Sequence, residues 1–404
     1  MATILDVTSF DAALKVHYTD DRVQDLSYED NPLLAMMPKM ENFTGKNLPI
    51  PIMYGHTQGR SASFAKALAN KYATNYEDFV LTRAKDYSLA DIDGEAMDAS
   101  KGNEAAFLDA TTSEIDSAIK SASRSLAVAM YRDGTGVIGQ INSTVSGTTV
   151  TLAEGQDITN FEVGQTIYFT SDGTSANLRD SGDTVKVATV NRGAGTFTVD
   201  ENLNSISGLT SGDYIVVEGD VEAKVKGLAA WIVYGGASAT SFFGVDRTVD
   251  ATRLGGVYYD GSSQSIEEAL LDGMNLGARE GGKPSHVFVN YARWADLQKA
   301  LGSKVQYVEH SSGDVGFRGI RIAGPKGFVD VYPDQNCQND RGWILDMRVW
   351  KLYSLGKAPK ILMGDGNRML RTASADAYEV RTGYYAQVGC RAPGFNTVVK
   401  LATS

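Results

Sequence analysis

One glycine-rich segment has the spacing of a phosphate-binding loop. Residues Gly134–Gly139 read GTGVIG and match the G-x-G-x-x-G pattern of dinucleotide-binding proteins. That chemistry needs a strand before the glycines and a helix after them, so that the phosphate meets the positive end of the helix dipole. Here the segment follows the C-terminal end of an expected long helix, where the dipole disfavours an anion. We therefore interpret it as a flexible turn.

A second segment begins like a calcium-binding loop. The letters from Asp200 onward are DENLN, but the sixth position, where glycine is required, holds Ser205. The twelfth position, where a bidentate glutamate is required, holds Ser211. We expect a β-turn between strands and no metal site.

The remaining reactive residue types form no catalytic or metal-binding pattern. The two cysteines, Cys337 and Cys390, lack metal spacing, and we expect two buried free thiols. No G-x-S-x-G, no P-loop and no local nucleophile signature is present. The histidines are scattered and unpaired in sequence: His17, His56, His286 and His310. We therefore expect a protein that is not an enzyme and that carries no cofactor.

The composition is that of a soluble globular protein large enough to bury several cores. The chain has 404 residues, 43% hydrophobic and 22% charged, with a net charge of −11. No apolar run approaches the ~18 residues of a membrane span, and the first residues lack the pattern of a signal peptide. The negative charge disfavours non-specific nucleic-acid binding but suits a container wall that does not adhere to DNA inside it.

The clearest expected element is a long helix from Asn103 to Tyr131. Asn103 is a candidate N-cap, and Asp133-Gly134 ends the helix. About 28 residues at ~1.5 Å per residue give a rod of roughly 42 Å, which we interpret as a structural spine. Its apolar residues recur at helical spacing and predict one core-facing side: Leu108, Ile115, Ile119, Ala122, Leu126 and Met130.

The chain before this helix predicts an extended arm and a long hairpin. Residues 1–44 resemble an arm with one short helix near Asn31, which needs another surface to lie on. Residues 45–92 predict a hairpin, with a strand at Asn47–Gly55, a helical tip at Ser61–Ala73 and a return strand at Phe79–Ile92. A two-stranded ribbon is marginal alone in water, so it should lean on another surface.

The tip of the hairpin carries side chains with two possible roles. Its charged residues are either a solvated polar face or contacts with a neighbouring subunit, and the ribbon as a whole favours the second. The candidate contact residues are Arg60, Phe64, Lys66, Lys71 and Tyr72.

Residues 142–220 predict a separate all-β domain. Short apolar runs alternate with Gly, Asn, Asp and Ser at about ten-residue spacing, a pattern typical of a small barrel or sandwich. Its basic residues are only Arg179, Lys186 and Arg192, so much of the negative charge lies here.

Residues 221–404 predict an α+β region. Ser265 and Glu268 form a capping box that opens a helix to about Arg279. A buried strand at His286–Asn290 then leads into a helix that Gly302 closes. Most of the remaining sequence has the character of strands. The fold class is therefore α+β with an inserted β domain.

This order of elements resembles the major capsid proteins of tailed bacteriophages, whose Hong Kong phage-type fold is shared with encapsulin shells. The most telling text lies at the end of the chain, in GFRGIRIAGPKGFVDVYPDQNC, RGWILDMRVWKLYSLG and DAYEVRTGYYAQVGCRAPGFNTVVKL. The resemblance covers nearly the whole chain outside the β insert, which is similar to the insertion domains of some members.

The resemblance implies a division of labour among these segments. It makes residues 1–44 the N-terminal arm, 45–92 the extended loop over an adjacent subunit, and 93–141 the spine helix of the peripheral domain. Residues 221–404 supply the axial domain and the rest of the peripheral domain. It implies self-assembly into pentamers and hexamers of an icosahedral virion head around double-stranded DNA, in a host bacterial cytoplasm and without a membrane. Scaffolding, portal and cement proteins are the implied partners.

Two departures and two alternatives accompany this resemblance. The arm starts almost at Met1, so we expect scaffolding to be a separate protein or the chain to be mature. Lys66 and Lys71 lie where some members form crosslinks, but no partner asparagine is identifiable, and we predict no crosslink. An encapsulin-type compartment shell is the first alternative, and a phage surface-binding protein with the β domain as its head is the second.

Overall fold

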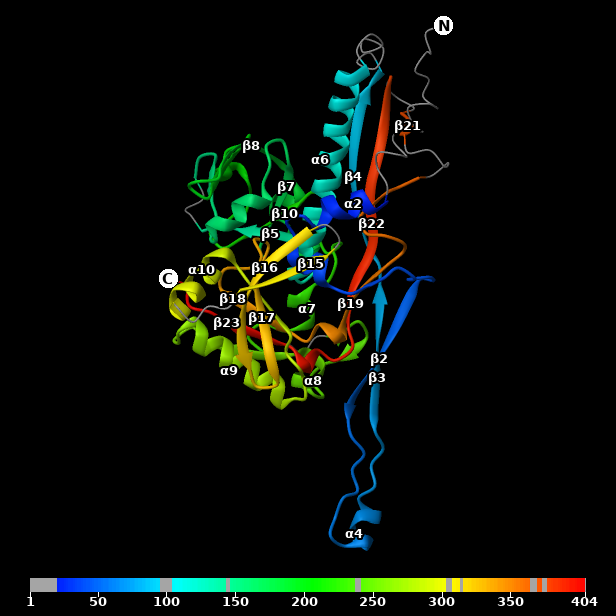
Figure 1. Ribbon diagram of the computed structural model, residues 1–404. Helices are drawn as coiled ribbons and strands as arrows, with labels where there is room; N and C mark the ends of the chain where they lie inside the picture. The colour runs from blue at the N-terminus through cyan, green and yellow to red at the C-terminus, as the bar shows by residue number, and fades with distance from the viewer. Residues whose placement is uncertain are drawn as a thin grey trace.

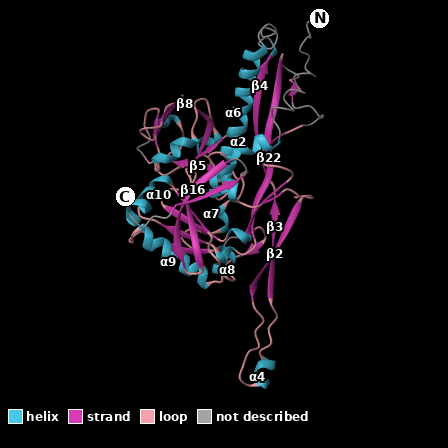
Figure 2. Cartoon of the chain, in the orientation of Figure 1, coloured by secondary structure: helices cyan, strands magenta, loops and turns pink. Residues whose placement is uncertain are grey.

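The fold has four connected parts, a two-stranded ribbon, a sheet packed on one long helix, a small barrel, and a seven-stranded sheet with helices (Figure 1). Figure 2, coloured by secondary structure, shows one short helix at the far end of the ribbon. The computed structural model describes residues 20–94, 104–142, 146–236, 241–302, 307–312, 315–363, 369–372 and 376–403.

The long helix and a six-stranded sheet form the spine of the molecule. Helix α6 spans Glu104–Tyr131, as the apolar spacing predicted, and the candidate cap Asn103 lies outside the described residues. The longest strand, β22, pairs antiparallel with β4 along the helix. We call this sheet the spine sheet. Its strands are β1 (Lys39–Met40), β4 (Ala84–Asp93), β19 (Trp350–Ser354), β20 (Lys360–Ile361), β21 (Met369–Arg371) and β22 (Ala377–Cys390).

The ribbon is shorter than the sequence predicted, because the return strand is two strands. Strand β2 (Asn47–Gly55) pairs with β3 (Asn75–Thr82) in a sheet of their own, whereas β4 joins the spine sheet. The break falls at Arg83, whose Nη1 donates hydrogen bonds to the carbonyls of Phe43 and Gly45, both at 2.6 Å. The expectation of one hairpin over 45–92 was wrong beyond Thr82, since apolar alternation continues through both strands and hides the change of partner.

The helix at the ribbon tip is also shorter than predicted. Helix α4 covers only Phe64–Ala69, within the expected Ser61–Ala73. The backbones of Gln58 and Tyr72 exchange two hydrogen bonds of 3.1 Å. This bridge closes the loop, and the chain beyond α4 must therefore leave the helical path.

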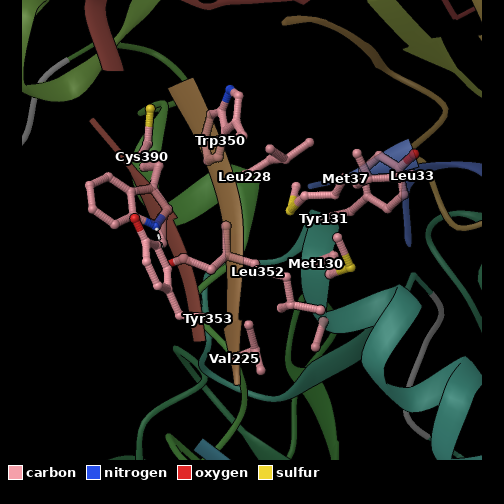
Figure 3. Packing of buried hydrophobic residues seen from close by; sticks show 14 of the residues in the cluster. Leu33, Met37, Met130, Tyr131, Val225, Leu228, Trp350, Leu352, Tyr353 and Cys390 are labelled. Atoms are coloured by element: carbon pink, nitrogen blue, oxygen red, sulfur yellow. Dashed lines mark hydrogen bonds between the residues drawn. The ribbon is translucent and has the colours of Figure 1, made fainter. Parts of the chain in front are cut away.

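The arm is partly folded into the body of its own subunit. It contains α2 (Asp20–Tyr28), α3 (Pro32–Met36) and β1. The surface on which this part of the arm lies belongs to the same chain, because Leu33, Met37 and Phe43 are at most 1% exposed within the main core. Figure 3 shows Leu33 and Met37 among the residues packed at the end of α6, beside Tyr131. The spacing of apolar residues predicts that they are buried, but it does not show which subunit buries them.

The inserted β domain is a closed six-stranded barrel. Its strand order is β5-β10-β7-β8-β9-β6, and a bridge between Ile141 and Leu152 joins the first strand to the last. It starts earlier than the predicted residue 142, because β5 pairs with β10. The strands are β5 (Val137–Gln140), β6 (Thr149–Thr151), β7 (Thr166–Thr170), β8 (Val185–Asn191), β9 (Thr196–Val199) and β10 (Tyr214–Val217). Short 3₁₀ helices connect them: η1 (Gly155–Asn160), η2 (Ser175–Asn177), η3 (Arg179–Gly182) and η4 (Leu203–Ser205).

The remaining chain forms a seven-stranded mixed sheet, which we call the central sheet, in the order β13-β23-β18-β14-β17-β16-β15. Its strands are β13 (Val257–Asp260), β14 (His286–Val289), β15 (Tyr307–Ser312), β16 (Val315–Gly324), β17 (Gly327–Pro333), β18 (Arg341–Leu345) and β23 (Thr397–Lys400). Around it lie α7 (Leu228–Trp231), α8 (Ala251–Gly255), α9 (Ile266–Arg279), α10 (Tyr291–Leu301), the hairpin β11 (Ser241–Phe242) and β12 (Val245–Asp246), η6 (Met347–Val349) and η7 (Pro393–Phe395).

The local signals for the two helices beside the central sheet are confirmed. Ser265 and Glu268 form the expected capping box at the start of α9. The side chain of Asn290 accepts a hydrogen bond from the Ala292 amide at the start of α10. Gly302 ends α10 with a φ of 53°, in the left-handed region that favours glycine.

The segments with apparent chemical spacing have structural roles. Gly134 and Gly136 have φ of 92° and 86° and form the turn between α6 and β5, as the sequence predicted. The carboxylate of Asp200, just after β9, accepts a hydrogen bond from the Lys186 amide of β8, which is a cross-strand contact. Cys337 and Cys390 are buried free thiols, as predicted.

The described residues contain neither a metal-binding group nor a membrane-spanning helix. No group of three metal-ligating side chains occurs among them. None of the helices in the described ranges combines the length and apolar character that crossing a membrane requires.

Candidate assembly surfaces

The root of the ribbon is held in the main core by one of its two faces. Successive strand residues point to opposite faces, and Ile50, Ile52, Phe79 and Leu81 are at most 4% exposed. The ring of Phe79 lies 4.9 Å from that of Trp231 in an edge-on arrangement. The start of the ribbon is therefore as firmly packed as the rest of the core.

Two hydrogen bonds from outside the ribbon fix its direction. The amide of Val80 donates to the carbonyl of Phe243, in the turn between β11 and β12, at 2.9 Å. The Nη1 of Arg253 donates to the carbonyl of Tyr54 at 2.6 Å. A ribbon edge would otherwise expose unpaired backbone groups, and these contacts occupy one on each strand.

The opposite face of the ribbon is open to solvent and carries two apolar pairs, one on each side of the Pro51–Asp78 pair. Pro49 pairs across the strands with Val80, and Met53 pairs with Tyr76. Met53, Tyr76 and Val80 are 47%, 64% and 37% exposed. Exposed apolar side chains grouped in this way, with one acid between them, are typical of a surface that meets another molecule.

The tip of the ribbon holds all five side chains that the sequence singled out there. Phe64 opens α4 with 83% of its surface exposed, and Tyr72, just beyond the helix, is 60% exposed. Arg60, Lys66 and Lys71 are also exposed, and none of them forms an ion pair within the described ranges. Their role as contacts with a neighbouring subunit stays a prediction.

The predicted core face of the spine helix lies against the arm and the spine sheet. Ile115 and Ile119 pack with Ile92 and Val380 in one cluster, whereas Leu126 and Met130 belong to the main core. All four helix residues are at most 1% exposed. The side chain of the fifth predicted residue, Leu108, lies outside the described residues.

The outer face of the spine sheet forms a second open surface. Tyr87 and Leu89 on β4 are 50% and 55% exposed, on the side turned away from α6. The ring of Tyr87 lies 6.0 Å from that of Tyr385 on β22. Lys360 and Arg381 line the same shallow hollow, which is therefore apolar with a basic edge.

A buried polar cluster joins three parts of the chain, and sequence analysis did not find it. Asp334 accepts hydrogen bonds from the Tyr131 hydroxyl at 2.8 Å and from the Asn336 amide at 2.9 Å. Asn336 in turn donates to Asn31 of the arm at 2.9 Å. Burial raises the pKa of Asp334 to about 6, and its hydrogen bonds oppose that rise. No local motif predicts this cluster, because Tyr131 and Asn31 lie 203 and 305 positions from the residues that they contact, Asp334 and Asn336.

Comparison with known proteins finds similar structures but no similar sequence. No family model matches the chain, and no curated protein matches it in sequence. Among solved structures, the cyanophage A-1(L) capsid asymmetric unit is similar, with a TM-score of 0.53 and 11% identity over 92% of this chain and 93% of that one. The chain has a phage capsid fold. Capsids of a native GTA particle and of Mycobacterium phage Bobi are also similar, with TM-scores of 0.47 and 0.44, 8% and 10% identity, and coverage of 92% and 100% of this chain and 90% and 100% of theirs.

The order of the parts described above is consistent with a phage capsid fold. The match to the cyanophage chain covers nearly all of both chains. At this identity the likeness concerns the fold alone. The contact surfaces must therefore be argued from this chain's own residues.

Proposed function

We propose that this chain is a structural subunit that self-assembles into the pentamers and hexamers of an icosahedral phage head. The observation that carries the proposal is the ribbon. A phage capsid fold here extends a β-ribbon whose open face exposes Met53, Tyr76 and Val80 and whose tip contacts nothing else in the described chain. Such a surface gains burial only from another molecule, and repeated copies of the chain supply it.

The remaining parts have complementary roles in this proposal. The spine sheet with α6 acts as the peripheral domain, and the central sheet with α9 and α10 acts as the axial domain. Head-to-tail contacts of one surface with a different surface close into rings when the rotation between copies fits five or six members. Many such contacts together stabilise a shell far beyond the affinity of any single one.

The partners follow from the same role. The shell encloses double-stranded DNA without sequence-specific binding, and the net charge of −11 limits adhesion of the DNA to its wall. Separate scaffolding, portal and cement proteins complete the head, which assembles in the host cytoplasm and becomes part of the virion. The chain performs no catalysis and binds no cofactor in this proposal.

Removal of the ribbon tip tests the proposal. Gly55 and Asn75 are paired across the ribbon, so His56–Thr74 can be replaced by an Asn-Gly turn that closes the two strands. We expect the shortened chain to fold, since the buried root residues remain, but to form no stable shells. Electron microscopy and sedimentation of the full-length and shortened chains measure this.

The folding of the shortened chain can be checked separately from its assembly. Circular dichroism and tryptophan fluorescence of the shortened chain report the main core, which contains Trp231, Trp343 and Trp350. Normal shells from the shortened chain would contradict the role of the tip. A full-length chain that forms only a fixed small oligomer, even with scaffolding protein co-expressed, would contradict the capsid function itself.

A further inference from the structure

The ribbon tip carries positive charge that the subunit itself does not neutralise. Residues 55–75 contain Arg60, Lys66 and Lys71 and no aspartate or glutamate. All three side chains are exposed, and none forms an ion pair with the described part of the chain. The tip is therefore a cationic surface without an internal partner.

The same tip has a shallow apolar hollow beside these charges. Phe64, Ala67 and Leu68 line it from α4, while Arg60 and Lys71 lie at its edge. Phe64 and Leu68 are 83% and 50% exposed. Apolar area ringed by charge is the composition of a protein–protein contact, in which the charges select the partner.

The barrel carries the opposite charge in large excess. Between residues 142 and 220 there are eleven aspartates and glutamates and three basic residues. Two of the three bases are already paired within the barrel, Arg179 with Asp213 and Arg192 with Glu162, each at 2.8 Å. The barrel thus keeps most of its negative charge for its surroundings.

Part of this charge is gathered along one row of the barrel wall. The amide of Glu218 bonds to Thr166 of β7, Thr166 pairs with Lys186 of β8, and the amide of Asp200 bonds to Lys186. Residues at the ends of β10, β7, β8 and β9 therefore lie side by side across the barrel wall. Glu218 lies on this row, Glu201 follows Asp200 at its end, and Asp183 lies three residues before Lys186, where the chain enters β8. All three are exposed, and we call them the acidic row, although the exposed Lys186 lies between them.

The two surfaces cannot meet within one subunit. The tip lies at the far end of the ribbon, well away from the barrel (Figure 1). The root of the ribbon is held by buried aromatic packing and by the Val80–Phe243 hydrogen bond, so the ribbon cannot fold back. A partner for the tip must come from outside the subunit.

We propose that the ribbon tip of one copy docks on the barrel of a second copy, with Arg60, Lys66 and Lys71 facing the acidic row. This inference rests on the proposed shell function and names the partner of the tip within it. Opposite charges steer the copies together and reject like-charged alternatives, while the hollow at α4 supplies apolar burial. A barrel placed under a neighbour's ribbon tip also gives the insertion a role in the shell.

A charge-exchange experiment on the full chain tests the contact. The first variant reverses the tip with Arg60→Glu, Lys66→Glu and Lys71→Glu, and the second reverses the acidic row with Asp183→Lys, Glu201→Lys and Glu218→Lys. These six side chains make no hydrogen bond or ion pair in the described structure, so both variants should fold. We expect each variant alone to yield at least about tenfold fewer shells, and the combined variant to recover them.

A matched control separates position from net charge. It combines the reversed tip with Glu41→Lys, Asp91→Lys and Glu114→Lys, three exposed acids outside the barrel. Recovery of shells with the acidic row but not with this control set supports the contact. Equal recovery with both, no recovery with either, or normal shells from the tip reversal alone would each overturn it.

The experiment also distinguishes failure of this contact from failure of the proposed function. If the unaltered chain forms shells and the exchange fails, the capsid function stands and the tip meets another surface. If only the nucleic acid content of otherwise normal shells changes on tip reversal, the tip binds nucleic acid and the barrel contact is refuted. An unaltered chain that forms no shells or rings refutes both.

Discussion

The hydroxyl of Tyr131, the last residue of α6, donates a hydrogen bond of 2.8 Å to Oδ2 of Asp334, which follows strand β17. Both side chains are buried, and the Leu33 amide of the arm lies 3.4 Å from the same oxygen. The end of the spine helix, the arm and the end of strand β17 in the central sheet therefore meet on one carboxyl group. This group therefore ties the three parts together through hydrogen bonds.

Replacement of Asp334 by asparagine should flatten the pH dependence of stability between about pH 4 and pH 6. Burial raises the pKa of Asp334 from 3.8 to about 6 in the folded chain. In that interval the unfolded chain releases the proton while the folded chain holds it, so stability falls as the pH rises and the loss is complete above the folded pKa. The shift corresponds to about 3 kcal/mol. Urea unfolding of both chains across this range measures it.

The comparison for Asp334 has an internal control. Asparagine has nearly the same shape and can still accept the Asn336 amide, so the two chains should differ least near pH 4. The free energy of unfolding of the variant should then rise relative to that of the original chain as the pH rises to 6. Parallel stability profiles over this interval would contradict a raised pKa for Asp334.

Truncation of Phe79 should loosen the root of the ribbon. Phe79 is fully buried, and its ring contacts those of Trp231 and Phe242. Phe79→Ala should cost about 3–5 kcal/mol, because it removes apolar contacts and leaves a cavity. Val80→Ala, one residue along on the exposed face, should cost less than about 1 kcal/mol. Similar unfolding midpoints for the two variants would argue against a ribbon anchored by this core.

Gly227 should tolerate no side chain. It lies where the chain returns from the barrel, and a Cβ there would collide with the carbonyl oxygens of Met130 and Ala129 at the end of α6. Gly227→Ala should therefore destabilise the subunit by at least about 3 kcal/mol. Gly155→Ala is the matched control, since its nearest atom would be the Gly195 Cα at 3.8 Å, and it should change stability by about 0.5 kcal/mol or less. Thermal unfolding of the two variants compares them.

The elements that sequence predicted best are those whose signals are local. The spacing of apolar residues from Ile115 to Met130 gives α6, and the pair Ser265 and Glu268 gives the start of α9. These signals act within a few residues, where helix periodicity and capping are decided. The order of such elements was enough to predict the fold.

The features that sequence missed depend on which distant segment a residue meets. Apolar and polar residues alternate in the same way before and after Arg83, yet β3 and β4 belong to different sheets. Leu33 is as apolar as a residue that binds a neighbour, and only the complete fold places it in its own core. The Tyr131–Asp334 bond spans 203 positions, a separation at which local pattern carries no information.

Excision of the barrel should leave the rest of the subunit folded. Val137 pairs with Val216, so the chain enters and leaves the barrel at neighbouring points, and a short Gly-Ser linker can replace Ile138–Ile215. The barrel core runs from Ile141 to Ile215 and shares no residue with the main core. Two cores without common residues should unfold independently.

Tryptophan fluorescence measures this directly. None of the four tryptophans lies between residues 137 and 217, so their emission reports the body of the subunit alone. We expect the free energy of unfolding of the excised chain to lie within about 1–2 kcal/mol of that of the same region in the full chain. The loss arises from Arg132, whose partner Asp157 is removed. An isolated chain of residues 137–217 should unfold cooperatively by circular dichroism. If excision instead abolishes the buried tryptophan signal, the barrel is part of the folding unit, and the charge exchange at its surface must be interpreted through the stability of the whole subunit.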